Sequence, residues 1–227
     1  MVDFKHAKYL MQTKIKMQNR IAAIYDQDEE MSAVDNARLP VMPQGSAVIL
    51  SQDVYEALSV VQDVTRDTNK EYPFFLMGRV DGQVVYFDKF TADSKNSQGT
   101  VANFSQFLIN KLTDFIAVSP KDGSRIVAHG HSHPKLSDYY LNFSLGDMTG
   151  YMEMQDDNPV FKSKQIELCS VLLAGGNYNF LFYDGNDYYK FSEVFYQDKN
   201  GALHPVPCYG TEKSNLMTRV FNGGRNS

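Results

Sequence analysis

The stretch from Ile126 to Asp147, IVAHGHSHPKLSDYYLNFSLGD, decides how the rest of the chain is interpreted. Its first eight residues follow a two-residue period, which is typical of a β-strand and sends His129, His131 and His133 to one face. Pro134 is expected to end this strand, because proline has no N–H to donate to a sheet. The sequence therefore predicts three imidazoles side by side near the end of a strand.

A helix is predicted to begin at Ser144-Leu145-Gly146-Asp147, which brings a carboxylate next to the imidazoles. Two histidines and an aspartate are ligands that a catalytic zinc ion accepts, with a fourth position left for water. A structural alternative stays open, because Ser144 as the N-cap and Asp147 in the first turn would stabilise any helix. We favour the metal interpretation because the histidines, the proline and the S-x-x-D sequence occur together.

The composition of the 227-residue chain excludes several classes of protein. With 43% hydrophobic and 22% charged residues, the chain can bury a sizeable core. The net charge of −5 argues against a general nucleic-acid binder, which is usually basic. Two isolated cysteines, Cys169 and Cys208, favour a reducing, cytoplasmic setting. No apolar run approaches the ~18 residues that span a bilayer, so we expect no membrane span.

Three regions are expected along the chain. Residues 1–45 indicate an N-terminal helical arm and linker, because apolar residues recur at helical spacing among basic ones before prolines and a glycine. We expect this arm to pack on its own domain, on a second copy or on a protein partner; contact with a membrane surface or nucleic acid stays open. Residues 46–205 are expected to form the compact domain, and 206–227 a flexible tail.

Strands and helices are interleaved in the compact region. Strands are expected at residues 47–50, 71–77, 84–87, 126–133, 165–173, 177–183 and 188–195. One helix is expected to begin at Ser51 and to bury Val54, Leu58, Val61 and Val64. A second helix has an apolar stripe that begins with Phe104 and Phe107 and ends at Ile116. This order indicates an α/β or α+β fold, with a mixed sheet flanked by helices.

H-S-H-P followed by S-x-x-D resembles the JAMM motif of the JAB1/MPN/Mov34 metalloprotease family, also called MPN-plus. That family has a glutamate upstream, on a strand that ends in glycine. Here Glu71 lies seven residues before Gly78 in the segment EYPFFLMG. The resemblance covers roughly residues 47–195 and implies an MPN/JAB-like, cytidine-deaminase-like mixed sheet with the N-terminal helical arm as an extension.

Two positions depart from the family pattern. Ser144 lies eleven residues after His133, whereas the family usually places its serine eight residues after. We expect the three extra residues to bulge in the loop after Pro134 without moving the start of the helix. Phe74 stands where the family often has a small glycine, a change that concerns packing and not chemistry.

The resemblance implies a role for each residue of the motif. His131, His133 and Asp147 would bind one zinc ion per chain, which lowers the pKa of a bound water to about 7. Glu71 would hold that water as a general base and return its proton to the leaving amine. Ser144 would donate its hydroxyl to the developing oxyanion.

Other side chains near the motif also have expected roles. We expect His129 to hydrogen-bond and orient a ligand, with an extra metal ligand as the alternative. Tyr139, Tyr140 and Phe143 would line the approach to the zinc and contact a substrate tail; core packing stays open for Phe143, and an exposed loop position stays open for the two tyrosines. Asp138 is a reserve carboxylate, for which we favour the role of a solvated charge in the loop.

The activity that the resemblance implies is zinc-dependent hydrolysis of peptide or isopeptide bonds at the C-terminal glycine of ubiquitin or a ubiquitin-like protein. One alternative is a non-catalytic MPN-type scaffold. Another is a partner-binding module in which His129 completes a closed, structural metal site. A zinc nucleobase deaminase is excluded, because the sequence has neither H-x-E nor P-C-x-x-C.

Overall fold

The computed structural model describes residues 39–92, 105–134, 142–144, 147–148, 151, 159–184 and 187–208. Its strands are β1 Ala47–Ser51, β2 Pro73–Asp81, β3 Val84–Ala92, β4 Arg125–His133, β5 Glu167–Ala174, β6 Asn177–Tyr183, β7 Tyr188–Lys190, β8 Val194–Gln197 and β9 Leu203–Pro205. Its helices are α2 Gln52–Thr68, α3 Gln106–Val118 and α5 Pro159–Lys164. Within these residues, no helix combines the length and the apolar character needed to cross a membrane.

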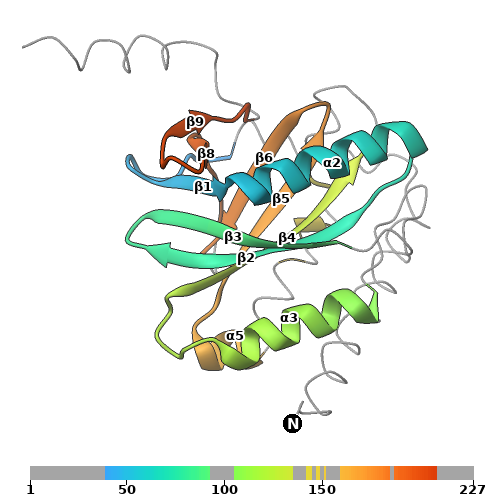
Figure 1. Cartoon of the computed structure of the whole chain (residues 1–227). Helices are drawn as coiled ribbons and strands as arrows, with labels where there is room; N and C mark the ends of the chain where they lie inside the picture. Colours follow the sequence, from blue (N-terminus) through green and yellow to red (C-terminus); the bar gives the residue numbers. More distant parts are fainter. Residues whose placement is uncertain are drawn as a thin grey trace, which may run out of the picture.

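The strands of the described part form one mixed sheet, in the order β7-β6-β5-β4-β2-β3-β1-β8-β9. β2 pairs antiparallel with β3 and β4, β4 pairs parallel with β5, and β1 lies parallel between β3 and β8. A bridge between Tyr178 of β6 and Cys208, just beyond β9, joins two distant parts of this sheet, which curls on itself (Figure 1). The predicted mixed sheet flanked by helices is confirmed.

Helix α2 covers one face of the sheet. Ser51 caps it as predicted, because its hydroxyl accepts a hydrogen bond from the N–H of Val54 at 3.3 Å. The predicted inward residues are buried except Val64, which is 36% exposed, while Thr65 is buried in its place. At 100° per residue, position 65 and not 64 lies on the line of Val54, Leu58 and Val61. The prediction for Val64 was therefore wrong by one position.

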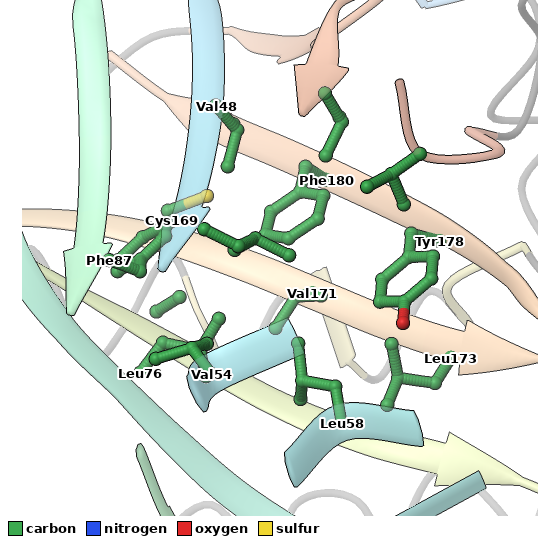
Figure 2. Close-up of a cluster of buried hydrophobic side chains, with 14 of the residues drawn as sticks. Val48, Val54, Leu58, Leu76, Phe87, Cys169, Val171, Leu173, Tyr178 and Phe180 are labelled. Atoms are coloured by element: carbon green, nitrogen blue, oxygen red, sulfur yellow. The ribbon is translucent and has the colours of Figure 1, made fainter. Parts of the chain in front are cut away.

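Alternate residues of the central strands point to opposite faces, and each face has its own core. Figure 2 shows Val54 and Leu58 of α2 beside Leu76 and Val171 of the sheet, within the largest apolar cluster. On the other face lie α3 and α5, which pack on a second cluster that includes Phe75, Met77, Val127 and Leu168 (Figure 1). The histidines of β4 share the face of Val127.

Several predicted elements differ from the observed ones. The strand predicted at 188–195 is two strands, β7 and β8, which lie far apart in the sheet. Between them Phe191 is buried, and its N–H donates to the carbonyl of Phe180. Because the sequence stays apolar between the two strands, its pattern does not show where one strand ends and the next begins. α5 and β9 were not predicted, and Phe107 of α3 is 51% exposed instead of packed. Phe104 lies outside the described residues.

Residues outside both predicted boundaries of the compact domain pack against it. Within the predicted linker, the N–H of Met42 donates to the carbonyl of Lys190, and Lys190 donates back to Pro40. Beyond residue 205, Val206 and Cys208 are buried and thus do not belong to a flexible tail. Of the predicted N-terminal arm, residues 1–38 lie outside the described part of the chain.

Gly130, between two histidines of β4, lies under the ring of Phe74 and beside Val171, its register partners on the two neighbouring strands. A Cβ placed on Gly130 would lie 2.4 Å from Cε2 of Phe74 and 2.5 Å from Cγ1 of Val171. The space for the ring of Phe74 in β2 thus comes from a glycine on β4.

We expect Gly130→Ala to lower the free energy of unfolding by about 1–3 kcal/mol, because an extra methyl group overfills this part of the core. Adding Phe74→Leu, which removes the closest ring atoms, should recover part of that loss. Denaturant unfolding of the two single variants and the double variant measures this coupling. Strictly additive changes would show that the ring of Phe74 does not limit the space at Gly130.

Candidate metal centre

Strand β4 carries the predicted histidines into the interior, on the face opposite α2. The strand is central, with Pro73 of β2 opposite His131 on one side and Leu172 of β5 on the other. His129 and His131 are buried, and His133 is partly buried at the last position of the strand. Because both neighbouring strands hold its backbone, the direction of each imidazole is set by the sheet.

Four polar side chains converge at the end of β4. The Nε2 atoms of His131 and His133 are 3.0 Å apart. Oε1 of Glu71 lies 3.7 Å from Nε2 of His133, and Oδ2 of Asp147 lies 3.9 Å from Nε2 of His131. Ligand atoms of Glu71, His131 and His133 all lie within 4.8 Å of one another. The structure thus brings Glu71, His131 and His133 into one group of potential ligands, whereas the predicted ligand Asp147 lies beside His131 and is not a member of that group.

This arrangement fits a metal ion by its donor chemistry. Zinc–nitrogen bonds of about 2.0–2.1 Å at a tetrahedral angle place two imidazole nitrogens about 3.3 Å apart. The Nε2 atoms of His131 and His133 are close to that separation, and each has a carboxylate oxygen within 4 Å. Two imidazoles with carboxylates suit zinc, and also the ferrous iron of two-histidine, one-carboxylate sites.

Glu71 comes to the centre through the register of β2 and β4. Continuing the pairing of Pro73 with His131 by two residues places Glu71 opposite His133, on the same face of the sheet. Burial raises the pKa of Glu71 to about 6, opposed by the nearby His131 and reinforced by the charge of Asp147. A carboxyl group with a pKa close to neutral is suited to general acid–base work.

Ser132, between the two predicted ligands, ties Glu71 to the histidine strand from the opposite face. Its hydroxyl accepts the N–H of Tyr72 at 3.1 Å, and its own N–H donates to the carbonyl of Tyr72. Thr65 of α2 is hydrogen-bonded to the same hydroxyl at 2.5 Å. This group was not predicted; its signal in the sequence was a threonine at a buried position of α2 and a serine on the core side of β4.

Ser144 and Asp147 form a reciprocal cap at the start of a helical segment that contains Asp147, Met148 and Tyr151. The hydroxyl of Ser144 donates to Oδ2 of Asp147 at 2.7 Å and accepts the N–H of Asp147 at 3.0 Å. The N-cap alternative therefore describes what Ser144 does here. An oxyanion role requires its proton to turn away from Asp147.

The flanking predicted residues lie as follows. The ring of His129 packs between Phe75 and Tyr151, at centroid distances of 5.4 and 4.6 Å, and is not a member of the Glu71 group of potential ligands. Burial, reinforced by His131, holds the pKa of His129 well below its usual value, so this imidazole is neutral.

Phe143 is fully buried, so its predicted contact with substrate is replaced by core packing. Residues 138–140, which include the three other loop candidates, lie outside the described residues.

Tyr151 was not predicted, although it contacts a predicted ligand. Its hydroxyl lies 3.3 Å from Nδ1 of His131, and both side chains are buried. Burial, followed by the charge of Asp147, holds the pKa of Tyr151 well above its usual value, so it is a neutral phenol. The signal in the sequence was the spacing of four residues from Asp147, which places both side chains on one face of a helix.

The sequence matches no family model, and no curated protein is similar to it. Among solved structures, the chain is similar to the solution structure of protein DSY2949 from Desulfitobacterium hafniense, at 14% identity and a TM-score of 0.42. That likeness covers 67% of this chain and 94% of the other. At this score the likeness carries no argument about function, and the JAMM resemblance stays a prediction from the motif.

In metal-free protein, the raised pKa of Glu71 predicts a pH-dependent effect of Glu71→Gln. The protonated form is favoured in the folded state, so the stability this group contributes is present below pH 4.5 and is lost as pH rises through about 6. Relative to wild type, Glu71→Gln should gain about 2 kcal/mol in free energy of unfolding between pH 4 and pH 7. Denaturant unfolding across this range measures it, and a pH-independent difference between the two proteins would contradict the raised pKa.

Proposed function

We propose that this protein is a zinc-dependent hydrolase of the JAMM type, acting on peptide or isopeptide bonds in the cytoplasm. His131, His133 and Asp147 hold the metal, and Glu71 is the general base. The substrate is the C-terminal glycine of ubiquitin or of a ubiquitin-like protein, in a conjugate or a fusion. An MPN-like topology of the mixed sheet is part of the same proposal.

The observation that carries the proposal is the convergence of two imidazoles and two carboxylates from three separate segments. Glu71 precedes β2, the histidines end β4, and Asp147 lies in the helical segment that follows. A buried group of this kind destabilises a fold unless its charges are balanced. A divalent cation would provide that balance, which supports a site selected for binding and not for stability.

Glu71 and Ser144 have different roles in the proposed amide hydrolysis. A bound zinc ion would supply a water of lowered pKa and polarise the scissile carbonyl. Glu71, whose carboxyl is only 14% exposed and has a pKa of about 6, takes a proton during attack and delivers it to the leaving amine. Ser144, at the rim of the same site, donates to the oxyanion once its hydroxyl turns from Asp147.

The choice of a Gly-Gly tail follows from the JAMM resemblance and from steric reasoning. The side chains of His133 and Glu71 are only 16% and 14% exposed, so an amide bond approaches them more easily when the residues beside it are small. Glycine residues on the acyl side of the bond satisfy that condition. A lysine side chain on the amine side is long and thin, which suits an isopeptide bond.

A second candidate is a binding module with a closed, non-catalytic metal site. The observation that favours it is the position of Glu71 within 4.8 Å of both histidine ligand atoms, from which its carboxylate could complete the coordination in place of water. Glu71, and not His129, is then the fourth ligand. The two candidates differ in what Glu71→Gln does to metal affinity.

The test combines metal content with hydrolysis. Purified wild type should contain about one equivalent of zinc per chain, and it should cleave Gly-Gly-tailed ubiquitin-like fusions in a chelator-sensitive manner. Glu71→Gln should retain the metal and lose a factor of about 10²–10⁴ in rate, as expected for loss of a general base. Loss of metal in this variant would instead support the closed site.

Glu167→Gln is the matched control, since Glu167 is a partly buried carboxyl at the opposite end of the β4–β5 pair, beside Ile126. It should leave both metal content and rate unchanged. Wild-type protein without stoichiometric metal would exclude both candidates. Equal rates for wild type and Glu71→Gln would exclude the hydrolase.

A further inference from the structure

Tyr151 stands out among the buried polar groups around the site, because its hydroxyl lies on the far side of a predicted ligand. It is 3.3 Å from Nδ1 of His131, while Nε2 of the same ring faces His133 and Asp147. His131 is 5% exposed and Tyr151 is 3% exposed. The hydrogen bond is therefore shielded from water.

The two nitrogens of an imidazole are coupled through its single proton. A neutral histidine that binds a metal through Nε2 must carry its proton on Nδ1, and a buried N–H without an acceptor is costly. Within the described part of the chain, the oxygen of Tyr151 is an acceptor within reach of Nδ1 of His131. A phenol can accept this bond and keep its own proton.

We propose that Tyr151 is a positioning residue that selects the metal-binding tautomer of His131. This inference rests on the metal site of the proposed function and names a residue on which metal affinity depends. Tyr151 and Asp147 are four residues apart in the sequence, a spacing that places both side chains on one face of a helix. The Tyr151 hydroxyl lies near Nδ1 of His131, and Oδ2 of Asp147 lies near Nε2 of the same ring. Residues that orient a metal-ligating histidine in this way commonly contribute a factor of about 10–100 in affinity.

The metal-free protein does not depend on Tyr151 to the same extent. Without a metal, His131 can carry its proton on Nε2 and donate it to Nε2 of His133, which is 3.0 Å away. In metal-free wild type the Nδ1 atom then accepts from the Tyr151 hydroxyl, and in metal-free Tyr151→Phe it is an acceptor without a donor, which is tolerated better than a buried N–H without an acceptor. Removal of the Tyr151 hydroxyl therefore penalises the metal-loaded state selectively.

The test is Tyr151→Phe, with zinc alone as the probe. The ring stays in place against His129 and Phe143, which it contacts at 4.6 and 5.7 Å. Competition with a chromophoric chelator at fixed pH should show zinc affinity about 10–100-fold weaker than in wild type. The unfolding midpoint of the metal-free protein should change little.

Tyr188→Phe is the matched control, because the hydroxyl of Tyr188 donates to the carbonyl of Met148 and so holds the backbone of the same helical segment. It should bind zinc as wild type does. Nitrogen-15 spectra of the imidazoles report the tautomer directly: zinc-loaded wild type should show a protonated Nδ1 on His131. The variant should show a shifted Nδ1 resonance.

The outcomes separate this inference from the proposed function. Wild type that binds no zinc removes the metal site and the inference together. Wild type that binds zinc, with Tyr151→Phe equally tight, overturns the role of Tyr151 and leaves the proposed function standing. Equal losses in Tyr151→Phe and Tyr188→Phe also overturn it, because they would show that the position of the helical segment matters and the tautomer does not.

Discussion

The antiparallel pairing of β2 with β4 is the constraint on which the candidate site depends. It places Glu71 across from His133, although the two residues are 62 positions apart in the sequence. The pairing extends past the regular ladder through Ser132, which bonds the backbone of Tyr72 in both directions. Thr65 of α2 ties the same serine to the helix on the other face. Loss of this pairing would separate the carboxylate from the imidazoles.

Strand β4 serves two different purposes on its two faces. One face carries the histidines toward the carboxylates, and the other carries Ala128, Gly130 and Ser132 into the core beneath α2. The small residues are needed because the ring of Phe74 occupies the space above Gly130. The size of the core residues on one face therefore controls the position of the ligands on the other. This coupling gives the site a rigid support, which a metal centre requires.

The helical segment that follows Ser144 adds the second carboxylate and the phenol. Its start is stabilised by the reciprocal cap between Ser144 and Asp147, and its interior side is held by the burial of Phe143, Met148 and Tyr151. The eleven-residue spacing from His133 does not prevent Asp147 from lying near His131. Negative charge on Glu71 is unfavourable at this centre, because burial and the negative charge of Asp147 both raise the pKa of Glu71. Binding of a cation would relieve the same repulsion.

Elements whose signals are local could be predicted from the sequence alone. The period of β4, its end at Pro134, the N-cap at Ser51 and the cap at Ser144 follow from interactions within a few residues, and all can be read from the pattern. It also identified Glu71, His131, His133 and Asp147 as candidates through their residue types and order. The separation of β7 from β8, the Ser132–Thr65 contact, the Gly130–Phe74 fit and the Tyr151–His131 bond were decided only by the tertiary structure. Most of these features join residues that are far apart in the chain. Side-chain packing across strands has no period along the sequence, so a local pattern does not show which residues come into contact.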